Sequence, residues 1–185
     1  MAQKGNKNVK GICAGKGECI MATLRRILIA TDFSDYSKEA LDHAVYLAKS
    51  VNANLYLFHV FEQPLYNPAV SSRLGARVID VMEWIKSMRE EDRGRLLRLA
   101  HEIGRKGVKV HSILKEGTPF REILKAADKV SADLIVLGTQ GRTGLDRFMM
   151  GSVAERVARQ APCPVLIVRP KAGRARKRRN ARKPG

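Results

Sequence analysis

The chain has 185 residues, of which 44% are hydrophobic, so it can form one domain of ordinary size and bury a core. No apolar run approaches the roughly 20 residues of a membrane-spanning helix, and the basic N-terminus has no apolar stretch like that of a secretory signal. We therefore expect a protein of the cytoplasm with no membrane partner. Lys and Arg number 35 against 18 Asp and Glu, which gives a formal net charge of +17.

Most of the excess positive charge lies near the two ends of the chain. Residues 171–185 contain eight basic residues and no acidic one, and residues 1–23 combine glycines and lysines without hydrophobic periodicity. We expect a disordered basic extension at 1–23, a folded domain at 24–170 and a disordered basic tail at 171–185. Met21, just before the folded part, is a candidate for the natural start.

Short apolar runs alternate with helical patterns along the folded part. The predicted strands span 27–30, 55–60, 108–114, 133–138 and 165–168. The predicted helices span about 40–51, 74–103, a stretch opened by Thr118-Pro119, and 152–160. Ser34 or Asp35 is the expected N-cap of the first helix, and Gly104 and Gly107 are expected to end the second.

This alternation predicts a doubly wound α/β fold, in which five parallel strands are covered by helices on both faces. Ligands of such sheets bind beyond the carboxyl ends of the strands. We therefore expect function in the loops that start at Thr31, Phe61, Lys115 and Gly138.

One segment carries the strongest chemical signal. It leaves a strand at Gly138, passes Gly141 and Arg142, and enters a helix at Gly151-Ser152. Glycines let main-chain N–H groups approach a phosphate closely, and a helix N-terminus favours anions. The Ser152 hydroxyl adds a donor and Arg142 adds positive charge. The segment therefore favours phosphate binding.

A structural explanation of the same residues stays open. Ser152 and Glu155 have the spacing of a capping box, which would explain Ser152 without a ligand. Gly138 and Gly141 fit ordinary turns. Asp32, at the end of the first strand, would accept a hydrogen bond from a nucleoside or serve as a turn residue or N-cap. For His59 we expect a structural role and no catalysis.

The ordered motifs resemble the universal stress protein family, from about residue 24 to residue 170. The glycine segment fits the pattern Gly-x2-Gly-x9-Gly-Ser of its ATP-binding members. The segments that agree are Arg26 to Ser34, Leu57 to Val60, Gly117 to Pro119 and Ala161 to Val168. Ala30 departs from the family, in which proline is common there, and the stretch from Leu65 to Arg73 is an insertion.

The resemblance implies a Rossmann-like fold of the adenine nucleotide alpha hydrolase type that binds ATP with Mg²⁺. Asp32 would lie at the adenine or ribose end, Val60 would offer backbone contacts to the base, and the glycine segment would hold ribose and phosphates. The residues expected to bind nucleotide are Ala30, Thr31, Asp32, Val60, Gly138, Gly141, Arg142, Gly151, Ser152 and Val153. No residue is assigned to catalysis or to direct metal ligation.

These signals predict an ATP-binding regulatory or stress-response module with slow hydrolysis at most, because no general base is paired with the glycine segment. One alternative is a dimeric interaction protein of the same fold that lacks a nucleotide. The resemblance implies a homodimer through the last strand, Val165 to Val168, in either case. Another alternative is weak, non-specific nucleic-acid contact through residues 171–185, without base stacking because no aromatic residue interleaves the charges.

Overall fold

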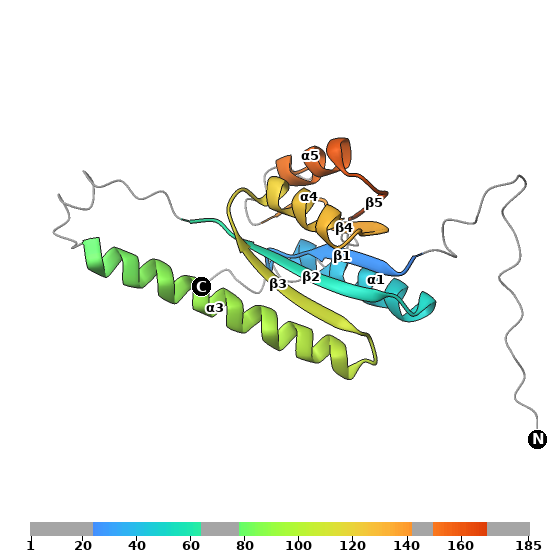
Figure 1. Cartoon of the computed structure of the whole chain (residues 1–185), viewed down its shortest axis with the longest axis horizontal. Helices are drawn as coiled ribbons and strands as arrows, with labels where there is room; N and C mark the ends of the chain where they lie inside the picture. Colours follow the sequence, from blue (N-terminus) through green and yellow to red (C-terminus); the bar gives the residue numbers. More distant parts are fainter. Residues whose placement is uncertain (1–23, 64–77, 142–149, 170–185) are drawn as a thin grey trace, which may run out of the picture.

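The computed structural model describes residues 24–63, 78–141 and 150–169 (Figure 1). The two predicted tails, the insertion and Arg142 lie outside these ranges. Among the helices that the structure describes, none combines the length and apolarity needed to cross a membrane.

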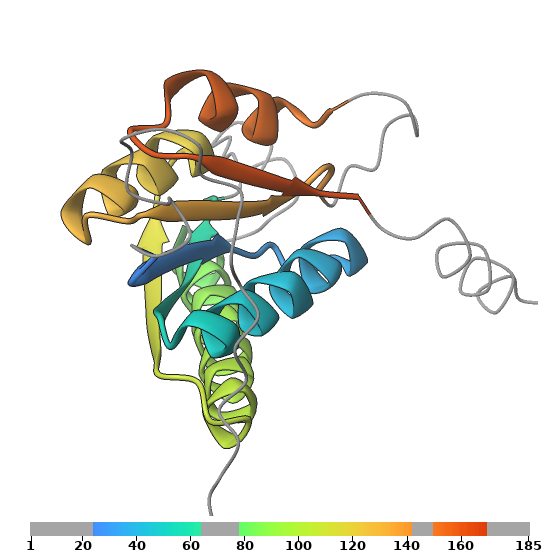
Figure 2. The same cartoon turned by 90° about the vertical axis from the view of Figure 1, so that its right-hand side faces the viewer.

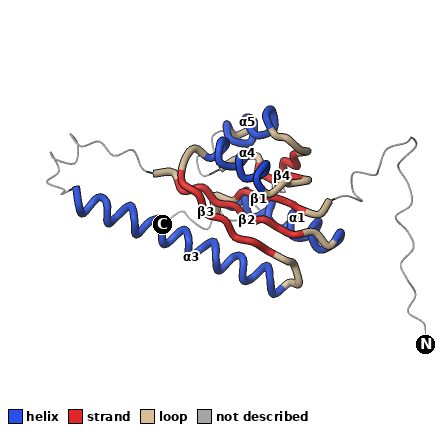
Figure 3. Tube along the Cα trace, viewed as in Figure 1, coloured by secondary structure: helices blue, strands red, loops and turns tan. Residues whose placement is uncertain are grey.

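The described residues form one parallel sheet in the strand order β3-β2-β1-β4-β5. The strands are β1 (Arg26–Ala30), β2 (Asn54–Phe61), β3 (Val110–Glu116), β4 (Leu134–Gly138) and β5 (Val165–Val168). The helices are α1 (Asp35–Val51), α3 (Val78–Arg105), α4 (Pro119–Lys129) and α5 (Ser152–Gln160). Figures 2 and 3 show α1 and α3 on one face of the sheet and α4 and α5 on the other. The predicted doubly wound parallel α/β fold is confirmed.

The central strand, β1, is apolar because both of its faces are covered. Ile27, Leu28 and Ile29 of β1 are fully buried, and β1 pairs in parallel with both β2 and β4. Ile27 and Ile29 belong to the core beneath α1 and α3, whereas Leu28 belongs to the core beneath α4 and α5. Successive side chains of a strand point to opposite faces, so one short run supplies both cores.

Ser34 is the N-cap of α1, since its side chain accepts from the main-chain N–H of Ser37. The expectation that Gly104 ends the second helix was wrong, because α3 continues to Arg105. The chain leaves the helix at Gly107, which adopts φ +82° and donates to the carbonyl of Gly104 at 2.9 Å. Only the second glycine needs the conformational freedom of a residue without Cβ.

Asp133 ties together the amino-terminal ends of β1 and β4. Its carboxylate accepts from the main-chain N–H groups of Arg25 and Arg26 at 2.9 and 2.8 Å. Burial alone would raise the pKa of Asp133, but these hydrogen bonds and the Arg26 guanidinium hold it below its ordinary value of 3.8. The candidate site lies at the opposite, carboxyl ends of these strands.

Candidate functional site

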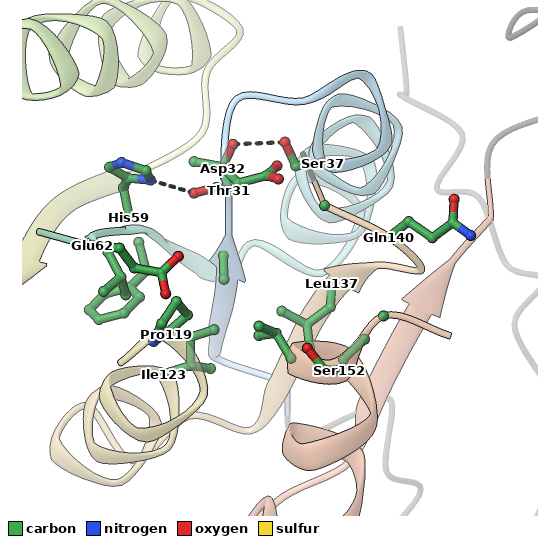
Figure 4. Close-up of a pocket in the computed structure, with 18 of the residues that line it drawn as sticks. Thr31, Asp32, Ser37, His59, Glu62, Pro119, Ile123, Leu137, Gln140 and Ser152 are labelled. Atoms are coloured by element: carbon green, nitrogen blue, oxygen red, sulfur yellow. Dashed lines mark hydrogen bonds between the residues drawn. The ribbon is translucent and has the colours of Figure 1, made fainter. Parts of the chain in front are cut away.

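The candidate site lies where the chain reverses the direction in which it builds the sheet. From β1 the chain proceeds to β2 and β3 on one side, and from β4 it proceeds to β5 on the other. The loops that leave β1 and β4 therefore diverge and open a crevice at their carboxyl ends. A cavity of about 340 Å³ occupies this position (Figure 4). Its volume falls in the range of small-molecule sites, roughly 300 to 1,000 Å³.

The cavity combines an apolar wall with polar groups at its edges. The apolar part comes from β2, β4 and α4 and includes Val60, Leu137, Pro119 and Ile123. The polar part comes from the loops after β1, β2 and β4 and from the start of α5; it includes Thr31, Asp32, Glu62, Gln140 and Ser152. Such a surface suits a ligand that has one flat apolar part and one strongly polar part.

Asp32 has a structural partner on one side and the cavity on the other. Its Oδ1 accepts from the main-chain N–H of Ser34 at 3.0 Å and from the Ser34 hydroxyl at 2.6 Å. These bonds form the turn that starts α1, so the turn interpretation of Asp32 is confirmed. Its Oδ2 lies beside Gly141, because a Cβ built on Gly141 would be 2.8 Å from that atom. The structure thus brings together two residues that are far apart in sequence and that were both predicted for the site.

The side chain of Thr31 is buried and engaged within the protein. Its Oγ1 lies 3.0 Å from the Ser37 Oγ and accepts from the main-chain N–H of Phe33 at 3.0 Å. The main-chain carbonyl of Thr31 accepts from the Nδ1 of His59 at 2.7 Å (Figure 4). Thr31 lines the cavity, and its hydrogen bonds position the loop that presents Asp32.

The glycines of the motif each meet a different part of the chain. A Cβ on Gly138 would lie 2.9 Å from the carbonyl oxygen of Tyr36, so the absence of a side chain lets α1 pack on the end of β4. The N–H of Gly151 donates to the carbonyl of Thr139 at 2.8 Å, which fixes the entry to α5. Gly138, Gly141 and Gly151 all line the cavity.

The capping-box interpretation of Ser152 was wrong. The N-cap of α5 is Gly151, whose carbonyl accepts from the N–H of Glu155 at 3.0 Å, and no side chain caps this helix. Ser152 is the first residue of α5 and is solvent-exposed. Ser152, Val153 and Ala154 form the first turn, where main-chain N–H groups have no partner within the helix, and all three line the cavity.

The remaining predicted positions complete this arrangement. Ala30 is the last residue of β1 and Val60 is the last but one of β2; both are half-buried and line the cavity. Arg142 lies outside the described residues. Within the part of the chain that the structure describes, no group of three or more His, Cys, Asp or Glu side chains could hold a metal ion.

Several residues of the cavity wall were not predicted. Glu62 and Gln140 lie in two of the loops in which we expected function, those that start at Phe61 and Gly138, although neither residue was predicted individually. His59 was expected to be structural and lines the cavity. Met88 and Asp92 of α3 also line it. Asp92 follows Glu90 and Glu91, and such an acidic run normally indicates a solvated helix face.

Comparison with known proteins places the chain among related sequences and folds. The model of the family described as "Universal stress protein family" matches residues 23–169. Universal stress protein MJ0531 of Methanocaldococcus jannaschii is 40% identical over 146 residues, which cover 78% of this chain and 82% of that protein. The solved structure of hypothetical protein MJ0577 has a TM-score of 0.66 and 28% identity, covering 80% of this chain and 97% of its own.

A third comparison concerns a ligand. The solved structure of a universal stress protein in complex with cAMP has a TM-score of 0.56 and 26% identity to this chain. It covers 78% of this chain and 96% of its own. That protein therefore binds a purine nucleotide on a related fold.

Proposed function

The chain belongs to the universal stress protein family, and from this premise we propose that it binds ATP with Mg²⁺ in the switch-point cavity and acts as a nucleotide-dependent regulatory or stress-response module. The observation that carries the proposal is the placement of the α5 N-terminus and an apolar wall in the same cavity. Each part of the nucleotide has a chemically suitable counterpart there.

The first turn of α5 is the counterpart of the phosphates. The N–H groups of Ser152, Val153 and Ala154 carry the positive end of the helix dipole, and the Ser152 hydroxyl is an additional donor beside them. Since Gly151 is the N-cap and its own N–H bonds to Thr139, the donors offered to phosphate begin at Ser152. A chain of phosphates passing Gly141 would extend away from Asp32 towards this turn.

The apolar wall is the counterpart of the base. Val60 at the carboxyl end of β2 and Pro119 and Ile123 of α4 provide contacts to a flat ring, and the main chain of Val60 provides polar groups for its edge. Asp32 lies between this wall and the glycines, where its Oδ2 side suits a ribose hydroxyl. This order of base, sugar and phosphate follows the crevice between β1 and β4.

We propose a switch rather than efficient turnover. Hydrolysis requires a water held in line with the terminal phosphate and a group that orients it. Asp32, the carboxylate placed beside the glycines, has Oδ1 bound to Ser34 and lies at the sugar end of the proposed pose. Binding would order the first turn of α5 and the loop after β1, and hydrolysis would be slow at most.

The proposal is tested by Ser152→Asp. A carboxylate at the first position of α5 favours the helix dipole and is solvent-exposed, so the fold should keep its stability. The same charge should repel phosphate and lower ATP–Mg²⁺ affinity by at least about tenfold, or 1.4 kcal/mol, in titration calorimetry. Ser152→Ala removes only the hydroxyl and should have a smaller effect.

Ala158→Glu is the charge-matched control, because Ala158 is exposed on the same helix and does not line the cavity. It should bind ATP as the native chain does. Mass analysis of small molecules released from the purified protein provides an independent measurement, and native protein should release adenine nucleotide. Equal ATP affinity of Ser152→Asp and Ala158→Glu would contradict the site.

We further propose that two copies associate through β5. This strand is the edge of the sheet beside β4, and Val165, Leu166 and Ile167 remain partly exposed. Among the described strands none lies on the far side of β5, and a second β5 would pair with the main-chain groups there across a two-fold axis.

A further inference from the structure

His59 contacts two hydrogen-bond acceptors from two different elements. Its ring is 2% exposed. Nδ1 lies 2.7 Å from the carbonyl oxygen of Thr31, after β1, and Nε2 lies 3.2 Å from Oδ2 of Asp92, on α3. Figure 4 shows the imidazole turned towards Thr31 at the edge of the cavity. The ring therefore bridges the loop after β1 to the long helix α3.

The two contacts fix the orientation of the ring. A carbonyl oxygen cannot donate, so Nδ1 donates its hydrogen to Thr31. At the other nitrogen, one hydrogen lies between Nε2 and the Oδ2 of Asp92 and joins the two side chains. His59 is thus held at both ring nitrogens, once from the loop after β1 and once from α3.

The bridge holds a strained loop. Phe33 adopts φ +62°, a conformation that a bulky side chain rarely takes and that persists only when its surroundings hold it. Its ring packs on His59 with centroids 4.4 Å apart, and its N–H bonds to the Thr31 hydroxyl. Asp32 lies between Thr31 and Phe33. The contacts of His59 therefore constrain the main chain on both sides of Asp32.

We propose that His59 is a positioning residue: its two hydrogen bonds, to Thr31 and to Asp92, clamp the loop that carries Asp32 against helix α3 and keep the cavity ready for its ligand. The clamp itself is a property of the protein alone. Its effect on affinity rests on the proposed function, for which ATP is the probe.

Asp92→Asn tests this mechanism because it preserves the shape and can keep the hydrogen bond. The amide NH₂ of asparagine can donate to Nε2, while Nδ1 still donates to Thr31. Asp92→Ala instead leaves Nε2 without its partner. Glu90→Gln is the matched control, since it removes a carboxylate from an exposed position of α3 that pairs with Arg93 rather than with Arg95.

Two measurements follow for each protein. Amide hydrogen exchange at Phe33 and Ser34 should be roughly tenfold faster in Asp92→Ala and nearly native in Asp92→Asn and in Glu90→Gln. ATP–Mg²⁺ affinity should fall about tenfold in Asp92→Ala and stay close to that of the native chain in Asp92→Asn and in Glu90→Gln.

The outcomes separate the clamp from the proposed function. Unchanged exchange at Phe33 in Asp92→Ala, or exchange in Asp92→Asn as fast as in Asp92→Ala, would overturn the clamp. Equal ATP affinity of the native chain and Asp92→Ala would overturn its effect on the ligand. If ATP fails to bind any of the proteins while the exchange rates follow the expected pattern, ATP binding is wrong and the clamp stands.

Discussion

Replacing Gly138 with alanine measures how closely α1 packs on the end of β4. The added Cβ would lie 2.9 Å from the carbonyl oxygen and 3.0 Å from the carbonyl carbon of Tyr36, and 3.3 Å from the main-chain nitrogen of Ser37. All three are main-chain atoms, so no rotamer change relieves the contact. The first turn of α1 or the end of β4 must shift by a few tenths of an ångström.

The size of the effect follows from two opposing contributions. Overpacking of this kind costs about 1 to 3 kcal/mol. Alanine also lowers the conformational entropy of the unfolded chain, which stabilises the folded state by about 0.4 to 1 kcal/mol. We expect Gly138→Ala to lower the free energy of unfolding by about 1 to 2 kcal/mol, or to lower Tm by about 2 to 8 °C. Urea unfolding followed by circular dichroism measures the first quantity.

Gly104→Ala is the matched control. Gly104 lies inside α3, and a Cβ there would meet only Val110 Cγ1 at 3.9 Å, an ordinary contact. Alanine should therefore stabilise the chain by about 0.5 to 1 kcal/mol through helix propensity. If the free energy of unfolding of Gly138→Ala equalled that of the native chain, or increased as in Gly104→Ala, the close packing of α1 on β4 would be refuted.

Asp133→Ala should lower the free energy of unfolding at pH 7 by about 2 kcal/mol, because two main-chain N–H groups lose a charged acceptor. Burial would raise the pKa of Asp133, but the hydrogen bonds outweigh it, and the pKa in the folded chain lies below the ordinary value of 3.8. The carboxylate therefore contributes its full stabilisation above pH 3.8, and this stabilisation is lost as the pH falls through the lowered pKa. Urea titrations should show native and variant converging in acid, and a constant difference would contradict the assignment. Ile167→Pro should convert a dimer into a monomer in sedimentation experiments, since proline at an edge strand removes a donor for the second copy; a persistent dimer would place the interface elsewhere.

The inner strands β1, β2 and β4 were predictable because each is a short, largely apolar run whose residues are mostly buried. The predicted 165–168 matches β5, and the other strands differ from prediction by one or two residues at their ends. Boundaries are set by hydrogen bonds that single residues do not encode. At the end of α3, two glycines three residues apart gave the same local signal, and the helix continues past the first of them, which follows the buried Ile103.

The residues of the candidate site that directly follow strands could be predicted from the sequence, whereas those that α3 contributes could not. Asp32 and Gly141 could be placed together because both follow strands that adjoin in a doubly wound sheet. Asp92 could not, since its burial depends on the rotation of α3 against β2 and on a partner 33 residues earlier. Glu91 beside it is exposed, and nothing in the local sequence distinguishes the two acids.

The glycine motif itself combines folding and binding. A Cβ on Gly138 would lie 2.9 Å from the carbonyl oxygen of Tyr36, and a Cβ on Gly151 would lie 3.3 Å from the carbonyl oxygen of Thr139, so close packing alone favours both glycines, even in a protein with an empty cavity. Ser152 is different, because it caps no helix and is exposed at the cavity where the first turn of α5 offers its N–H groups. A chain that keeps the glycines and places a carboxylate at this position would therefore keep the fold and lose phosphate binding.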